Sequence, residues 1–513
     1  MNINYKKVGL LLLILFVGIS VVSASDDFDD NTLEQTYESQ QVTESNSYDN
    51  IENTNINENL NDDEDTTPVT VTNANYDAVM GSLSNYDTIT FDDTFTGKTM
   101  NINAPVTITA TSTAQFTDSQ ISITVSGVTI SNLNIENTDI DGSVITATNV
   151  NNIILDSNTI VTNNENNYEK AIGITFNNVN ESNITNNIIT VSGYPQNLGW
   201  DDSTGVWLSE SQVTGIYMSQ VNYINVTDNT LTVTNSSTPI PDNTTIEAIT
   251  LKTNSNYVNI TDNSIDVSGS NYVYGISLSN VVNYTYIANN GILIFSNNYI
   301  NAIQLDKTKH SVVYNNEILG STFPESTYVP SHERVAYGIV VTTSSFPPIY
   351  GESTNNTIRA NTIDLESTIV YAIELYLAND TIIDGNDITA TGNITIGIGL
   401  YNSSNNRIEE NIIDLEAHNK TISPLFYEQI PKTSCGIIIV GDTSSTNNNV
   451  TDNAIMVSDD QSRTDTLYCV IVRATGNKVV ENELETTFDG ITPVLTGDNA
   501  VDYDSGNTVN SNS

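Results

Sequence analysis

The chain has 513 residues, of which 62 are acidic and 15 are basic, and its formal net charge at pH 7 is −47. Phosphate binding needs clustered Lys and Arg, so this balance argues against nucleic acid as a partner. It also disfavours strongly anionic polysaccharides unless metal ions bridge the two, whereas neutral glycans, cations and basic proteins remain open. Two cysteines, Cys435 and Cys469, are compatible with a disulfide, but two free thiols are the favoured expectation.

The N-terminal residues 1–24 are predicted to be a secretory signal peptide. Lys6 and Lys7 precede an apolar run, and Val22-Ser23-Ala24 matches a small-residue cleavage site. The run is short for a membrane span, so an uncleaved anchor is the less favoured alternative, and no transmembrane segment is expected in the mature chain. Residues 25–67 are acidic, polar and free of Lys and Arg, which predicts a disordered spacer.

A short helix is expected over Asn75–Leu83, because Tyr76, Val79, Met80 and Leu83 share one face at helical spacing and either Asn73 or Asn75 is suited to the N-cap. Such a helix would cover the open first unit of a repeat protein. Alternating apolar residues then predict strands at Thr88–Phe91, Thr99–Ile102, Val106–Thr109, Ile121–Val125 and Val128–Ile130.

One phrase recurs eleven times in the remainder of the chain: an asparagine with an apolar residue three positions before it and another two positions after it. The asparagines are Asn158, Asn187, Asn229, Asn263, Asn290, Asn316, Asn361, Asn386, Asn411, Asn453 and Asn482. A second phrase precedes the first at a nearly fixed distance. It is a small residue followed by two apolar residues around one spacer, as in Gly173-Ile174-Thr175-Phe176 and Ala372-Ile373-Glu374-Leu375.

This repeat predicts a parallel β-helix over residues 68–494, followed by a polar C-terminal tail over residues 495–513. Apolar residues two apart indicate short strands with one buried face, and a small unit of such strands buries that face only by stacking on its copies. The small residues suit a tight corner. The asparagines suit a turn in the left-handed region, and when stacked about 4.8 Å apart they can form a hydrogen-bonded structural ladder.

The two phrases resemble the right-handed parallel β-helix repeats of the pectate-lyase-like superfamily, over roughly Asp87 to Val494. The resemblance implies an all-β, right-handed parallel β-helix solenoid. It leaves the function open, because that superfamily holds lyases, hydrolases, epimerases, phage tailspikes and adhesins. The Asn/Thr-rich composition, signal segment and acidic leader also resemble the adhesin-like surface proteins of methanogenic archaea, which implies a secreted or cell-surface location.

Signals for catalysis are sparse. Asn137-Thr138-Asp139 matches only the first part of the polygalacturonase signature, because no histidine lies between glycines and no Arg-x-Lys occurs. The best candidate for calcium binding or polysaccharide lyase chemistry is an acidic strip that contains Asp364, Asp387 and Asp414, with Arg359 and Arg407 nearby. The favoured alternative for this strip is a solvated outer face that prevents lateral pairing.

Aromatic residues supply the candidates for ligand binding. Tyr274, Tyr337, Tyr371 and Tyr468 directly precede the small corner residue, and the alternation places them outward, either to stack on sugars or to cover the junctions between units. Trp200 and Trp207 lie in the insertion Gly193–Gln212 and are the preferred contact residues.

The sequence therefore predicts a non-catalytic, adhesin-like β-helix that binds glycans or neighbouring cell surfaces. A metal-assisted polysaccharide lyase or hydrolase and a purely structural envelope protein are the alternatives. No catalytic residue is assigned, and calcium is the one candidate cofactor.

Overall fold

The computed structural model describes residues 67–138, 140–164, 170–193, 200–201, 206–207, 213–235, 245–269, 271–322, 334–343, 352–418, 434–442, 444–459, 467–488 and 492–513. These residues belong to one compact unit, Asp65–Ser513. The predicted signal peptide and nearly all of the predicted spacer lie outside them. No helix in the described ranges is long and apolar enough to cross a membrane.

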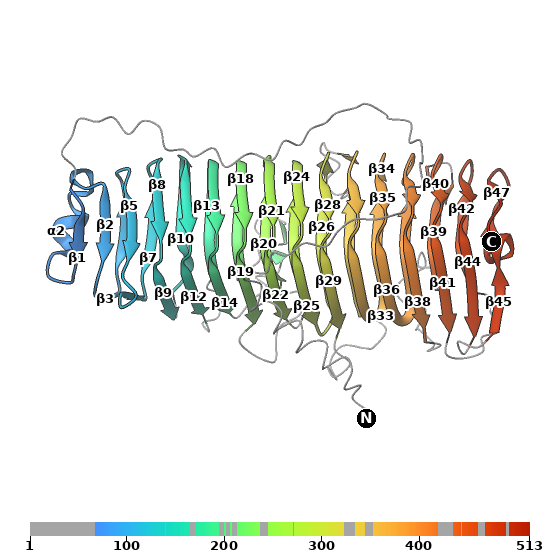
Figure 1. Ribbon diagram of the computed structural model, residues 1–513, viewed down its shortest axis with the longest axis horizontal. Coiled ribbons are helices and arrows are strands. Elements are labelled where there is room, and N and C mark those ends of the chain that lie inside the picture. Colours follow the sequence, from blue (N-terminus) through green and yellow to red (C-terminus); the bar gives the residue numbers. More distant parts are fainter. Residues whose placement is uncertain are drawn as a thin grey trace, which may run out of the picture. The chain divides into compact units, whose positions relative to one another are not determined.

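The unit is a stack of coils, and each strand pairs in parallel with the equivalent strand of the next coil (Figure 1). The strands fall into three rows, and the longest strands bend from one row into another. The predicted all-β parallel β-helix is confirmed.

The first row carries the face that concerns function. It consists of β4 (Thr99–Ile102), β7 (Gln120–Ile123), β10 (Gly142–Asn151), β13 (Ala171–Thr185), β17 (Val213–Ser219), β20 (Thr245–Lys252), β23 (Tyr272–Ser279), β26 (Tyr299–Asp306), β30 (Val335–Thr342), β33 (Thr362–Tyr376), β36 (Asp387–Tyr401), β39 (Cys435–Asp442), β42 (Tyr468–Ala474) and β46 (Val501–Tyr503).

The second row begins with the first strand of the stack. It consists of β1 (Val69–Val71), β2 (Thr88–Phe91), β5 (Thr107–Ala110), β8 (Val128–Ser131), β11 (Ile153–Asp156), the second half of β13, β18 (Asn222–Thr227), β21 (Asn256–Thr261), β24 (Val282–Ala288), β27 (Thr308–Lys309), β28 (Val312–Tyr314), β31 (Ser353–Thr354), β32 (Thr357–Arg359), β34 (Ala378–Asn379), β35 (Ile382–Asp384), β37 (Arg407–Glu409), β40 (Asn449–Thr451), β43 (Lys478–Val480) and β47 (Thr508–Asn510).

The third row precedes the loops that vary in length. It consists of β3 (Thr94–Thr96), β6 (Gln115–Thr117), β9 (Asn134–Thr138), β12 (Thr159–Asn164), β14 (Ile188–Gly193), β19 (Thr230–Asn235), β22 (Ser264–Gly269), β25 (Gly291–Ser296), β29 (Glu317–Thr322), the first halves of β33 and β36, β38 (Ile412–Ala417), β41 (Ala454–Asp459), β44 (Glu483–Phe488) and, antiparallel to β44, β45 (Thr492–Thr496). A separate two-stranded ribbon pairs β15 (Trp200–Asp201) with β16 (Val206–Trp207).

The predicted N-terminal helix is present but shorter, as α2 (Tyr76–Met80) followed by the 3-10 turn η1 (Leu83–Asn85), and it lies at the start of the stack (Figure 1). Asn75 precedes α2 but does not cap it with its side chain. Its amide instead accepts a hydrogen bond from the backbone of Thr72 and donates one to the carbonyl of Thr70. Tyr76 is buried against the ring of Phe95, at 5.5 Å between ring centroids. That α2 shields the first coil remains a prediction.

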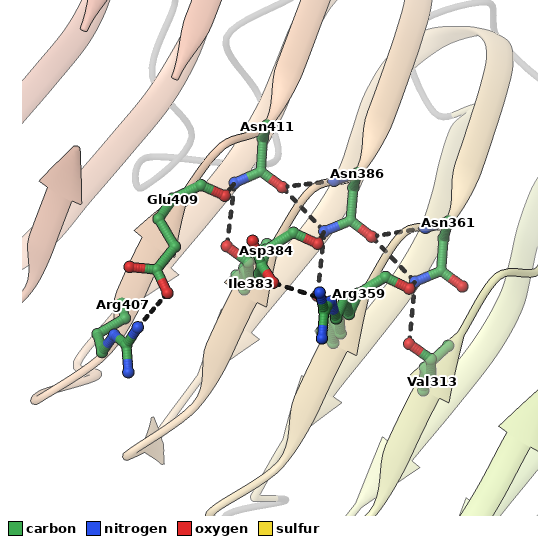
Figure 2. Close-up of polar contacts among 10 residues, drawn as sticks. Val313, Arg359, Asn361, Ile383, Asp384, Asn386, Arg407, Glu409 and Asn411 are labelled. Carbon is green, nitrogen blue, oxygen red and sulfur yellow. Dashed lines mark hydrogen bonds and ion pairs between the residues drawn. The ribbon is translucent and has the colours of Figure 1, made fainter. Parts of the chain in front are cut away.

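The predicted asparagine ladder is confirmed. Each ladder asparagine is buried, and its side-chain amide donates to the side-chain oxygen of the next, with N–O distances of 2.9 to 3.0 Å. The same oxygen also accepts the backbone N–H of the preceding ladder residue. Figure 2 shows that Asn386 accepts both bonds from Asn361 and donates to Asn411. The amide of Asn386 also donates to the backbone carbonyl of Ile358 in the preceding coil, at 3.0 Å. These bonds satisfy buried backbone groups at every turn.

The ladder asparagines were expected to adopt the left-handed backbone conformation themselves, and that expectation was wrong. The residue in the left-handed region is the one before each ladder asparagine, for example Asp228, Ala360 and Glu410, with φ of 55°, 54° and 57°. The asparagine itself is required for its amide, which both donates and accepts inside the coil. Asp228, Asp262 and Asp452, which directly precede ladder asparagines, therefore belong to the turn.

A second asparagine ladder was missed. Asn406, Asn448 and Asn477 are linked in the same way, and the backbone N–H of Asn477 donates to Asn507. The available signal was an asparagine five positions before a ladder asparagine, as in Asn406 and Asn411.

A polar tail was predicted for residues 495–513, but these residues complete the last coil instead. The 3-10 turn η2 (Gly497–Ala500) leads into β46, which pairs with β42, and β47 pairs with β43. Asn512 accepts the amide of Asn482 and so extends the first ladder. Asp498 accepts the amide of Asn512 at 2.6 Å, which closes the ladder with an acceptor.

The small corner residues behave as predicted. A Cβ atom on Gly215 would lie 2.5 Å from the carbonyl oxygen of Ala248 in the next coil, closer than real Cβ contacts allow. Both cysteines are free and buried, so no disulfide joins them. Their registers differ by one residue, because Cys435 lies opposite Tyr468 rather than Cys469.

Candidate functional site

The outer face of the first row is formed by the side chains that point away from the core of the stack. In β20, Ile249 and Leu251 enter the core, while Glu247, Thr250 and Lys252 point outward. The same alternation in β13 and β17 directs Thr175 and Tyr217 outward, and the parallel register sets Thr175, Tyr217 and Thr250 side by side. Residues more than 30 positions apart in sequence therefore share one surface.

A cavity of about 270 Å³ lies on this outer face. It is lined by Gly142, Ser143, Lys170, Ile172, Thr175, Asn177, Tyr217, Glu247 and Lys252. These residues come from β10, β13, β17 and β20 and from the residue just before β13. Hydroxyl, amide, carboxylate and ammonium groups thus converge around one aromatic ring, which is the composition of a polar ligand site.

Two buried oxygen atoms on β20 have no hydrogen-bond partner among the residues that the structure describes. Glu247 is only 6% exposed, and its Oε2 accepts no hydrogen bond from the described residues; the same holds for Oγ1 of Thr250, which is fully buried. Elsewhere in the cavity the hydroxyls of Ser143 and Thr175 are 2.6 Å apart, and Nζ of Lys252 lies 5.6 Å from the ring centroid of Tyr217. A buried polar atom without a partner is costly, so Glu247, which lines the cavity, favours a ligand that donates hydrogen bonds.

The predicted tyrosines lie in the same column of the outer face as Glu247. The register runs from Glu247 through Tyr274 and Asn301 to Tyr337 and Tyr371. Their outward direction is confirmed, but open ring faces are not. Tyr371 is buried, and its ring stacks on that of Tyr337 at 5.2 Å and 9°. The rings cover the junctions between coils, which was the alternative interpretation, and burial raises the pKa of Tyr274 above its ordinary value.

Glu374 is a carboxyl group on the outer face that the sequence interpretation missed. It is half-buried on β33, and burial raises its pKa from 4.5 to about 7. Its charge also contributes to the raised pKa values of Tyr299 and Tyr401. A signal existed, because Glu374 is a carboxylate at a spacer position that the neighbouring repeats fill with Thr250, Ser277, Gln304, Val340 and Gly399.

Glu247 and Glu374 are too far apart to act as a pair. Four coil steps separate β20 from β33, which at about 4.8 Å per step gives roughly 19 Å along the stack. The two carboxyl groups that hydrolyse glycosidic bonds lie about 5–9.5 Å apart. Asn137 of the Asn-Thr-Asp match is buried and hydrogen-bonded to the backbone of Ser119, so it is part of the framework, and Asp139 lies outside the described residues.

An exposed aromatic stack on the second row was also missed. Tyr223, Tyr257, Tyr284 and His310 occupy one turn position with positive φ, and successive ring centroids are 4.9, 4.9 and 5.0 Å apart within 8° of parallel. The rings cover one another's faces and leave their edges exposed, so they do not form an open platform for a sugar ring. Repeated Asn-Tyr pairs were the sequence signal.

The acidic strip on the third row is spread over several coils. Asp364 and Asp414 share a column with Thr389 between them, about 10 Å apart at two coil steps, and Asp387 occupies another column. Arg359 pairs with Asp384 at 3.0 Å, and Arg407 pairs with Glu409 (Figure 2). Burial, followed by the charges of Glu416 and Asp387, raises the pKa of Asp414. Among the described residues, no three His, Cys, Asp or Glu side chains gather where one metal ion would fit. Calcium binding therefore remains a prediction.

The predicted contact residues Trp200 and Trp207 face each other across the β15–β16 ribbon in backbone register. Their side chains are not among those that the structure describes. The insertion that carries them leaves the stack after β14 and returns at β17, the strand that supplies Tyr217 to the cavity.

Neither a protein-family model nor a curated protein sequence matches the chain. Several solved structures are similar in fold. Tailspike protein 3 of bacteriophage CBA120 is 12% identical with a TM-score of 0.38; the match covers 82% of this chain and 60% of that one, so this chain spans less than two thirds of its length. DFA-IIIase from Arthrobacter chlorophenolicus A6, in complex with GF2, is 10% identical with a TM-score of 0.44, covering 79% of this chain and 88% of that one.

A mutant tailspike protein of E. coli bacteriophage HK620, in complex with a pentasaccharide, is 11% identical with a TM-score of 0.45, covering 82% of this chain and 74% of that one. At these low identities and TM-scores, the similarities support no conclusion about function.

Proposed function

We propose that the protein is a secreted or cell-surface β-helix that binds glycans on the outer face of its first row without cleaving them. The observation that carries this proposal is the cavity between β10 and β20, where Oε2 of Glu247 is buried without a hydrogen-bond partner among the described residues and the ring of Tyr217 lines the same cavity. Sugars present hydroxyl donors together with apolar C–H surfaces. A carboxylate, hydroxyls and an aromatic ring in one cavity complement both features.

The same geometry favours binding over hydrolysis. Among the described residues Glu247 is the one carboxylate that lines the cavity, and Glu374 lies roughly 19 Å further along the stack. Glycoside hydrolysis uses two carboxyl groups that flank one bond. A rigid stack that holds polar groups in fixed register supplies recognition without that pair, as an adhesin requires.

Trp200 and Trp207 are proposed to extend the contact area. Their insertion leaves the stack after β14, in the coil that carries Thr175, and returns at β17, the strand that carries Tyr217, so its two ends lie on two coils that line the cavity. Variable insertions on a rigid scaffold are a common location for binding residues. Replacing both tryptophans with Ala is expected to weaken glycan retention and leave the thermal unfolding of the stack unchanged.

The test is to pass intact polysaccharides over the purified protein, with and without calcium, and to measure both their retention and their chain length. Retention without shortening supports the proposal, and Glu247→Gln should reduce it. Glu366→Gln is the matched control, because Glu366 is an exposed glutamate on β33 away from the cavity. Shortening of any polysaccharide would replace the proposal with an enzyme, and absence of retention would favour the structural envelope protein.

A further inference from the structure

Two opposite charges line the cavity without neutralising each other. Glu247 and Lys252 both lie on β20, five residues apart and on opposite sides of the small corner residue Ala248. Within the described part of the chain neither side chain belongs to an ion pair. The ammonium of Lys252 is instead directed toward the Tyr217 ring, at 5.6 Å from its centroid.

The two groups also differ in depth. Glu247 is 6% exposed and so belongs to the floor of the cavity, whereas Lys252 and Lys170 are half-buried at its rim. A charge-assisted hydrogen bond is about twice as strong as a neutral one, so an ammonium group satisfies the Glu247 carboxylate better than a hydroxyl does. By the same reasoning, Lys252 is complemented best by an acidic group near the cavity mouth.

Ligands with only one kind of charge fit less well. A purely cationic sugar meets Lys170 and Lys252 as it enters, and a purely anionic sugar meets the buried Glu247. A neutral sugar leaves both charges without a counter-charge. The volume of about 270 Å³ is also just below the ~300–1,000 Å³ of drug-sized ligand sites, which suits one small unit rather than a polymer segment.

We infer that the cavity binds a zwitterionic sugar unit, one whose ammonium group pairs with Glu247 and whose acidic group pairs with Lys252. This inference rests on the proposed glycan-binding function and specifies the class of sugar at that site.

Four sugars on one ring framework separate the charges. Muramic acid carries an amine and a carboxylate, N-acetylmuramic acid only the carboxylate, glucosamine only the amine, and N-acetylglucosamine neither. Titration of each into the full chain at pH 7, followed by ligand-observed NMR, measures the four affinities. Muramic acid is expected to bind at least about tenfold more tightly than each of the others.

Two variants assign the charges to residues. Glu247→Gln should bring the affinity for muramic acid down to that for N-acetylmuramic acid, and Lys252→Met should bring it down to that for glucosamine. Lys478→Met is the control, because Lys478 is exposed on β43 and lines no part of the cavity, and it should leave all four affinities unchanged. Unchanged thermal unfolding shows that each variant is folded.

Equal affinities for the four sugars would overturn the inference and leave the proposed glycan binding intact. Polysaccharide retention without binding of any of the four sugars would place recognition on another surface and also overturn it. If neither the sugars nor the polysaccharides bind, the proposed function itself fails.

Discussion

Replacing Glu374 with Gln is expected to stabilise the protein at pH 8 and to leave its stability nearly unchanged at pH 4. Burial raises the pKa of this carboxyl from 4.5 to about 7, so the folded state favours the protonated form. Below pH 4.5 both folded and unfolded chains hold the proton, and Glu374 contributes no penalty. Between pH 4.5 and 7 the unfolded chain releases the proton while the folded chain keeps it, so stability falls as pH rises. Above pH 7 the full penalty applies.

The size of the penalty follows from the pKa difference. The shift of 7 − 4.5 = 2.5 corresponds to about 3 kcal/mol at 1.36 kcal/mol for each pKa unit. Glu374 is half-buried, and solvent screening reduces this figure, so a gain of roughly 2 kcal/mol is expected for Glu374→Gln at pH 8.

The assay is unfolding of the wild type and the variant at pH 4 and at pH 8. The net charge of −47 makes both proteins pH-sensitive, but that dependence is common to the two and cancels in their difference. Solenoids do not always unfold in one step, so the shift of the first transition is compared. Glu366→Gln, an exposed substitution on the same strand, should change stability by less than about 0.5 kcal/mol at both pH values. An equal shift for Glu374→Gln at both pH values would refute the reasoning.

Three further predictions concern the ladder, the acidic strip and the cysteines. Asn386→Ala removes hydrogen bonds to Asn361, Asn411 and the backbone of Ile358, so it should destabilise the protein by about 3–5 kcal/mol in a denaturant titration. The control is Asn134→Ala, an exposed substitution on β9, which should cost less than about 0.5 kcal/mol. If the acidic strip binds calcium, Asp364→Asn with Asp414→Asn should abolish the calorimetric heat of calcium binding; an unchanged heat would place the ion elsewhere. Burial raises the pKa of Cys469 to about 12, and Cys435 is likewise buried, so a thiol reagent should label neither cysteine at pH 8 until the chain unfolds; rapid labelling of the folded protein would contradict their burial.

The fold could be predicted because its determinants are local and repeated. An asparagine between two apolar residues at fixed spacing marks each turn, so the ladder from Asn158 to Asn482 follows from the sequence. The last coil was missed because only the first half of the phrase, Val509 before Asn512, is present. The left-handed position was assigned to the asparagine rather than to the residue before it, because the sequence shows which residue recurs but not which of its properties the turn uses.

The candidate site was harder to predict because it depends on register between distant coils. Tyr217 occupies an ordinary spacer position, and Glu247 directly precedes the small corner residue of its repeat. The two line one cavity only because β17 and β20 pair side by side. Alternation correctly gave the outward direction of Tyr274 and Tyr371. It could not give their burial, because the neighbouring rings that cover them belong to other coils.

The most direct test of glycan binding at this cavity is the reactivity of individual lysines. The protein is treated with an acylating reagent with and without a polysaccharide that it retains, and labelling of each lysine is measured by mass spectrometry. Binding on the outer face predicts that Lys170 and Lys252 become protected while Lys98 and Lys478 are labelled as before. Unchanged labelling of Lys252 in the presence of bound polysaccharide would contradict the assignment of the site.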